Sequence, residues 1–140
     1  MFRKILVAFD GSPKAYEAFD YAIELALMSK PASCIVVLSV VQPPESLYFV
    51  EMSDVINGES RHYEELLGEL AEKAKKKDLE VETKVAIGHP AGTIVQTAKE
   101  KGCDLIVIGH KGKSMLEGLL LGSVSRRVAS EATCSVTIVK

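Results

Sequence analysis

The chain has few of the features that nucleic-acid-binding proteins use. Its 140 residues include no Trp and only 6 % aromatic side chains, too few for the aromatic platforms on which bases stack. The 17 basic side chains are outnumbered by 19 acidic ones, so no overall positive excess is available to neutralise a phosphate backbone. We therefore expect no nucleic-acid partner.

Cysteine and long apolar runs are also scarce. Cys34, Cys103 and Cys134 are scattered and contain no Cys-x-x-Cys pair, so they predict neither a disulfide framework nor a zinc site. Free thiols fit a reducing cytoplasm. No apolar stretch approaches the roughly 20 residues of a membrane span, and the N-terminal run in MFRKILVAFD is too short for a signal sequence. We expect a cytoplasmic protein with no membrane partner.

What the chain does have is a regular alternation of two patterns. Short apolar or alternating runs typical of strands occupy residues 4–9, 34–41, 80–88, 104–109 and 134–140. Between them, apolar residues recur at helical spacing over about 13–26, 61–77, 90–102 and 125–132. This βαβαβαβαβ order predicts one α/β domain over residues 1–140, with a parallel sheet covered by helices on both faces. In such an open sheet, ligands bind beyond the carboxyl ends of the strands, where the strand order reverses.

Two connections leave alternatives open. After the first strand, Asp10-Gly11-Ser12-Pro13 predicts a helix start with Pro13 at its first position and either Asp10 or Ser12 as the cap. Residues 45–58 show no clear period. We expect them to form an irregular, half-helical connection that covers the core, and the alternative is a mobile lid or a loop that contacts a partner.

A glycine-rich stretch, VIGHKGKSMLEGLLLGSVSRR, follows the fourth strand. Glycine usually stands where the backbone needs positive φ or approaches something closely, and a side chain at position 109 or 112 would block a group lying on the backbone there. Gly122-Ser123-Val124-Ser125 opens the last helix, whose free amides favour an anion, and the two hydroxyls add donors. The residues alone predict an anion site at a helix start or, as the alternative, an ordinary glycine turn with a serine cap. Neither GxxxxGK[ST] nor GxGxxG is present.

The spacing Gly109-x2-Gly112-x9-Gly122-Ser123 resembles the ATP-binding motif of the universal stress protein family. KILVAFDGSPKAYEAFDYAIELA is similar to the family's opening strand and helix, and GCDLIVIGHKG and LLLGSVSRRVASEATCSVTIVK are similar to its final third. Ser135 stands where the family commonly has Pro. The resemblance covers nearly the whole chain and implies a Rossmann-like, doubly wound open sheet of five parallel strands in the order 3-2-1-4-5.

The resemblance also implies a ligand, ATP or a related adenine nucleotide, with Mg²⁺ or Mn²⁺ carried on the phosphates instead of a protein cage. Asp10 would anchor the ribose or adenine, and the Val40 backbone would contact adenine. His110 would either donate to a phosphate or point to water. The implied ATP-binding residues are Ala8, Phe9, Asp10, Val40, Ile108, Gly109, His110, Gly112, Gly122, Ser123, Val124 and Ser125.

Three functions follow as hypotheses. The resemblance implies a nucleotide-dependent regulatory module of the stress response, acting on an unidentified protein partner and dimerising through the last strand, Val136, Thr137, Ile138 and Val139. A slow ATPase or phosphotransferase is the second hypothesis, although no residue stands out as a catalytic base. A nucleotide-free dimeric partner-binding protein is the third, and the intact glycine motif counts against it.

Overall fold

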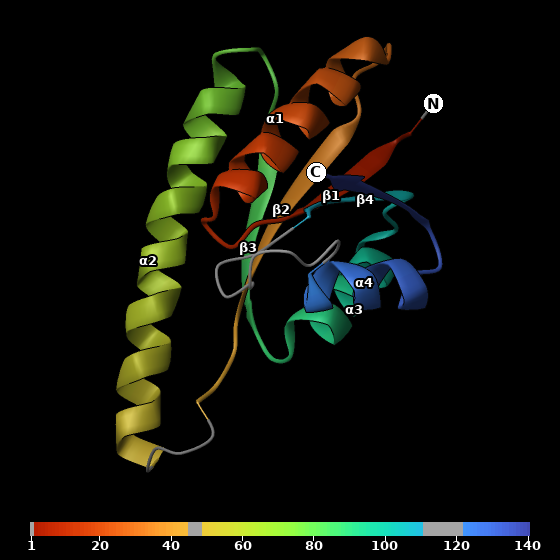
Figure 1. Ribbon diagram of the computed structural model, residues 1–140. Coiled ribbons are helices and arrows are strands. Elements are labelled where there is room, and N and C mark those ends of the chain that lie inside the picture. The colour runs from red at the N-terminus through yellow and green to blue at the C-terminus, as the bar shows by residue number, and fades with distance from the viewer. Residues whose placement is uncertain (1, 45–48, 111–121) are drawn as a thin grey trace.

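Four helices and five strands alternate along the chain, in a computed structural model that describes residues 2–44, 49–110 and 122–140 (Figure 1). The strands are β1 (Lys4–Ala8), β2 (Cys34–Val41), β3 (Val81–Ile87), β4 (Leu105–Gly109) and β5 (Ser135–Val139). The helices are α1 (Pro13–Met28), α2 (Phe49–Lys75), α3 (Pro90–Lys101) and α4 (Ser123–Glu131). The strands form one sheet in the order β3-β2-β1-β4-β5, and every pair is parallel. The predicted doubly wound topology is confirmed.

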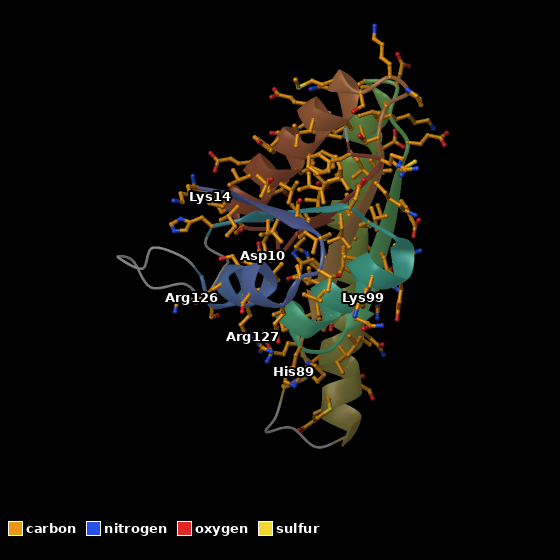
Figure 2. All side chains as sticks on the ribbon, turned by 90° about the vertical axis from the view of Figure 1, so that its right-hand side faces the viewer. Asp10, Lys14, His89, Lys99, Arg126 and Arg127 are labelled. Carbon is orange, nitrogen blue, oxygen red and sulfur yellow. The ribbon has the colours of Figure 1, made fainter. Side chains whose placement is uncertain are left out.

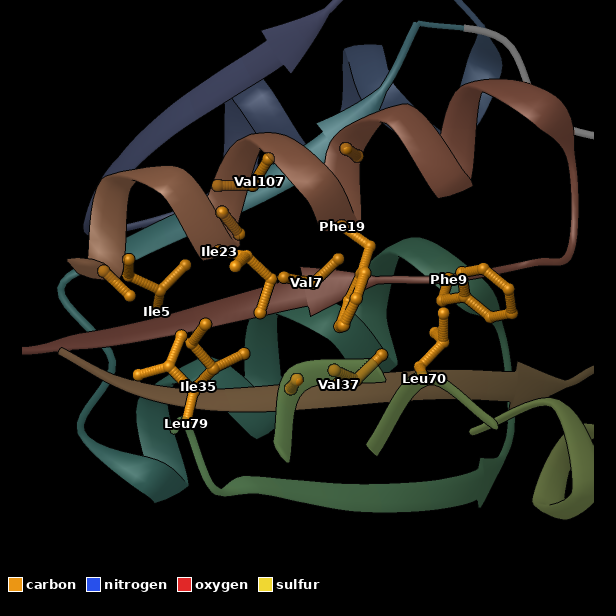
Figure 3. Close-up of a cluster of buried hydrophobic side chains, with 14 of the residues drawn as sticks. Ile5, Val7, Phe9, Phe19, Ile23, Ile35, Val37, Leu70, Leu79 and Val107 are labelled. Carbon is orange, nitrogen blue, oxygen red and sulfur yellow. The ribbon is translucent and has the colours of Figure 1, made fainter. Parts of the chain in front are cut away.

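The helices cover both faces of the sheet, α1 and α2 on one and α3 and α4 on the other (Figure 1). Strand β1 shows why, because side chains alternate across a strand. Ile5 and Val7 belong to the cluster that packs against α1 and α2, as Figure 3 shows. Leu6 and Ala8 belong to the cluster that includes residues of α3 and α4. Because β1 is buried on both sides from Ile5 to Ala8, every residue in that run is apolar.

The first helix begins as the sequence allows. The Ser12 side chain accepts a hydrogen bond from the Ala15 N–H at 3.2 Å, and Pro13 occupies the first helical turn. Of the two candidate caps, Ser12 is therefore the one used. The Asp10 carboxylate instead accepts from the Ser12 N–H at 3.0 Å, which shapes the turn that leads from β1 into α1.

The prediction for residues 45–58 is wrong in part. Helix α2 is continuous from Phe49 to Lys75, so it begins 12 residues before the helix expected at residue 61; residues 45–48 lie outside the described part. Gly58 costs a helix interior only about 1 kcal/mol relative to Ala, and its neighbours are compatible with a helix. None of residues 51–62 is buried, whereas Tyr63, Leu67 and Leu70 are. The turns over residues 51–62 therefore add no buried side chain to the core.

Across the described ranges, no helix combines the length and the apolar character needed to cross a bilayer.

Candidate functional site

A cavity of about 420 Å³ lies at the carboxyl edge of the sheet, where β1 and β4 end side by side. Its size falls within the range of small-molecule sites, roughly 300–1,000 Å³. The chain passes to opposite faces of the sheet after β1 and after β4, which is the point where open α/β sheets bind ligands. The described lining residues are Ala8, Phe9, Asp10, Ser12, Ala15, Leu38, Val40, Gln42, Glu59, Tyr63, Pro90, Ile94, Ile108, Gly109, Gly122, Ser123, Val124 and Ser125.

Most of the residues singled out in the sequence come together around this cavity. Asp10 follows β1, Val40 lies near the end of β2, and the 122–125 segment opens α4, yet all of them line the same space. Two predicted residues differ from the rest. His110 is not among the lining residues, and Gly112 lies outside the described part of the chain.

Gly109 is required for a reason that the sequence does not reveal. A Cβ atom at this position would lie 2.9 Å from the carbonyl carbon and oxygen of Lys14, closer than such atoms approach. The first turn of α1 therefore packs directly on the end of β4. The expectation that position 109 must be bare to admit a ligand needs this correction: Gly109 lines the cavity, but the tight neighbour of its missing side chain is the backbone of α1.

The two serines at the start of α4 differ in environment. Ser125 is 2 % exposed, and its hydroxyl lies 3.1 Å from the carbonyl oxygens of both His110 and Gly122. Its proton is therefore available to either of these two backbone carbonyls. Ser123 is exposed on the cavity lining. Both serines line the cavity, but Ser123 is the exposed hydroxyl of the predicted pair, whereas the Ser125 hydroxyl also links the start of α4 to the backbone.

Backbone hydrogen bonds hold the start of α4 against the ends of β4 and β5. The Gly122 N–H donates to the His110 carbonyl at 2.8 Å, and the His110 N–H donates to the Val139 carbonyl at 2.7 Å. Gly122 precedes the helix with φ −71° and ψ 157°, a conformation open to any residue. The unpaired amides of the first helical turn and the positive end of the helix dipole are thereby fixed at the cavity boundary.

Helix α2 supplies two lining residues that sequence reasoning missed, Glu59 and Tyr63. Tyr63 is 8 % exposed and its hydroxyl donates to the Asp10 carbonyl at 3.5 Å. Burial raises the pKa of Tyr63, and the negative charges of Asp10 and Glu59 raise it further. The two residues are four positions apart, which places them on one face of a helix. This spacing could have identified them as a pair on the cavity side of α2, provided that α2 was known to include position 59. Gln42, which directly follows β2, was also missed.

The arginines after the glycine stretch point elsewhere. Figure 2 shows Arg126 and Arg127 on α4, and both are exposed and absent from the cavity lining. An Arg127 guanidinium nitrogen lies 3.5 Å from the Glu131 carboxylate one turn later. Exposed ion pairs of this kind contribute little. The geometry therefore places neither side chain against a ligand in the cavity.

The comparisons with known proteins all lead to one family. The profile of the universal stress protein family matches residues 1–140. Universal stress protein YxiE of Bacillus subtilis is 37 % identical over 152 residues, covering all of both chains. The structure of universal stress protein UspA from Lactobacillus plantarum superposes with a TM-score of 0.91 at 24 % identity, covering 99 % of this chain and 97 % of that one. A universal stress protein crystallised in complex with cAMP matches with a TM-score of 0.75 at 28 % identity and the same coverage.

Proposed function

The chain belongs to the universal stress protein family, and from that premise we propose that its cavity binds an adenine nucleotide, ATP in particular, as the input of a regulatory module. One observation carries the proposal. The cavity at the strand-order reversal is lined jointly by Asp10, Val40 and the Gly122–Ser125 segment, which come from three separate parts of the sequence. The similar protein solved with cAMP supports an adenine nucleotide as the ligand class.

The residues present fit such a ligand. Apolar side chains such as Leu38, Ile94 and Ile108 offer a surface for a flat base, and the Asp10 carboxylate accepts hydrogen bonds from sugar hydroxyls or an amino group. The start of α4 supplies backbone amides and the Ser123 hydroxyl for phosphate oxygens. We therefore expect the nucleoside near Asp10 and Val40 and the phosphates near Gly122.

A divalent ion, Mg²⁺ or Mn²⁺, is proposed to bind through the phosphates. Within residues 2–44, 49–110 and 122–140, no group of three or more His, Cys, Asp and Glu side chains is placed to hold a metal ion. The phosphate oxygens of the nucleotide would therefore supply ligands that the protein does not, as is common for Mg²⁺ bound with nucleotides.

Strand β5 is proposed as the homodimer contact. It pairs with β4 on one side and ends the described sheet on the other, so one row of N–H and C=O groups is available to a second copy. Val136 and Ile138 pack against the core cluster, so the shared surface would come from the strand edge more than from buried side chains.

The test begins with the purified protein, denatured and chromatographed for released nucleotide, and then titrated calorimetrically with Mg-ATP. We expect saturable 1:1 binding, and a protein that binds no adenine nucleotide at all would contradict the proposal. Phosphate release during incubation would favour the ATPase hypothesis instead. Sedimentation of the same sample tests the dimer.

A matched pair of variants locates the site. Gly122→Val places a branched side chain at the cavity boundary, in a backbone conformation that tolerates it, so we expect a folded protein that no longer binds ATP. Gly68→Val is the control, because a Cβ at this exposed α2 position meets nothing within 4 Å. Equal ATP affinity of the two variants would show that the phosphates bind elsewhere.

A further inference from the structure

The described lining of the cavity carries negative charge in one part and the positive end of a helix dipole in another. Its carboxylates are Asp10 and Glu59, and no Lys or Arg among the described residues lines it. The α4 start, with the positive end of a helix dipole, borders the same space. Helices α2 and α4 cover opposite faces of the sheet (Figure 1), so the Glu59 carboxylate and the α4 dipole approach the cavity from opposite sides.

Tyr63 connects the helix face that carries Glu59 to the turn after β1. The Tyr63 hydroxyl donates to the Asp10 carbonyl at 3.5 Å, which joins α2 to the turn after β1. Glu59 stands four residues earlier on the same helix face and also lines the cavity. The charges of Asp10 and Glu59 both act on the Tyr63 hydroxyl, so the two carboxylates lie near one group.

We infer that Glu59 is a specificity-determining residue of the nucleotide site. Its carboxylate accepts a hydrogen bond from a donor on the nucleoside, either a ribose hydroxyl or the exocyclic amino group, and repels the phosphates toward α4. This inference rests on the proposed function and adds helix α2 to the residues that select the ligand. Glu59 is exposed, so a ligand reaches it without rearrangement of the helix.

The size of the effect follows from the kind of bond. A hydrogen bond to a charged group discriminates by about 10- to 100-fold against a ligand that lacks the partner group. Asp10 accepts from the same end of the ligand, so removing Glu59 should abolish a preference among nucleotides more than it abolishes binding itself.

The test titrates the wild type, Glu59→Ala, Glu59→Gln and the control Glu64→Ala with four magnesium nucleotides: ATP, 2′-deoxy-ATP, 3′-deoxy-ATP and inosine triphosphate. Glu64 is exposed on the same helix and does not line the cavity, so its variant changes the net charge equally. We expect the wild type and Glu64→Ala to prefer ATP over at least one analogue by about 10-fold or more. The rejected analogue identifies the donor group. Glu59→Ala should lose this preference, and Glu59→Gln should keep part of it because its amide oxygen still accepts.

Three outcomes overturn the inference. In the first, Glu59→Ala keeps the wild-type preference, and ATP binding by the wild type then leaves the proposed function intact. In the second, the wild type binds all four nucleotides equally. In the third, the wild type binds none of them, and the proposed function fails as well. Thermal unfolding is recorded for each variant, and if Glu59→Ala does not fold, the isosteric Glu59→Gln decides the result alone.

Discussion

Gly109 at the end of β4 packs against Lys14 in the first turn of α1, and a Cβ on Gly109 would lie 2.9 Å from the Lys14 carbonyl carbon and oxygen. Backbone atoms of a helix turn cannot move aside as a flexible side chain can. The contact brings α1 close to the carboxyl end of β4, which is also one border of the cavity.

Gly109→Ala should therefore destabilise the protein. Overpacking of this kind costs about 1–3 kcal/mol in the free energy of unfolding, measurable by urea denaturation. Gly92→Ala is the control, because a Cβ on Gly92 in α3 meets nothing within 4 Å and Ala favours a helix. A Gly109→Ala protein as stable as the wild type would show that α1 can shift, and its nucleotide affinity would then report whether the cavity shifts too.

Alanine variants of Ser125 and Ser123 should have different effects, one on stability and the other on ATP binding. The buried Ser125 hydroxyl is bonded to backbone carbonyls, so Ser125→Ala should lower the free energy of unfolding by about 0.5–1.5 kcal/mol. Ser123 is exposed on the cavity lining, so Ser123→Ala should weaken ATP binding and leave stability unchanged. Denaturation and calorimetry on both variants check this. The reverse pattern would mean that Ser125 is the phosphate ligand.

Asp104 should make stability depend on acid pH. Its carboxylate accepts from the Arg3 N–H at 2.9 Å and the Lys4 N–H at 3.0 Å. Desolvation raises the pKa of Asp104, but these backbone hydrogen bonds outweigh it and the net pKa is lowered. The carboxylate therefore stabilises the fold fully above the ordinary aspartate pKa of about 3.9, and this contribution is lost as the pH falls through the lowered folded-state value.

The measurement for Asp104 compares urea denaturation of the wild type and Asp104→Asn between neutral and acid pH. We expect the wild type to be more stable at neutral pH by about 1–2 kcal/mol. The difference should shrink as the carboxylate is protonated. A difference that is constant with pH would mean that the asparagine acts through packing alone.

Cys103 should resist thiol reagents in the folded protein. It is 8 % exposed, and burial raises its pKa to about 11, so little reactive thiolate forms near neutral pH. Cys34 is exposed. With a disulfide reagent at pH 8, Cys34 should react first, and Cys103 should react about 100-fold more slowly than an unperturbed thiol until the protein is unfolded. A variant that carries both Cys34→Ser and Cys134→Ser leaves Cys103 as the one thiol of the chain, and its rapid reaction would contradict the burial of Cys103.

Part of this account follows from local sequence. The alternation of apolar strands and amphipathic helices predicts the βαβ order, and the resemblance to a known family supplies the strand order that the structure confirms. Ser12 and Pro13 mark the start of α1 because capping depends on adjacent residues. The placement of Asp10 and Gly122 at one edge also follows, since parallel strands bring their carboxyl ends together.

Residues 45–58 mark where local reasoning failed. The lack of a clear apolar period predicted an irregular, half-helical connection, but α2 is continuous from Phe49. Glu59 was missed for this reason, because a residue cannot be assigned to a helix face before the helix is known to exist. Tyr63 lies within the helix expected over 61–77, but its contact with the Asp10 carbonyl depends on how that helix packs on the sheet.

The sequence by itself determined the order of strands and helices, most of their extent, and the glycine and serine residues at the cavity edge. These depend on periods of two and 3.6 residues and on neighbouring side chains. Three contacts were decided only by the tertiary structure. The Lys14 backbone leaves no room for a side chain at Gly109, the Ser125 hydroxyl bonds to the backbone, and the Tyr63 hydroxyl bonds to Asp10. The last of these contacts joins residues 53 positions apart. It depends on the rotation and tilt of a helix against a twisted sheet, and no local pattern encodes either.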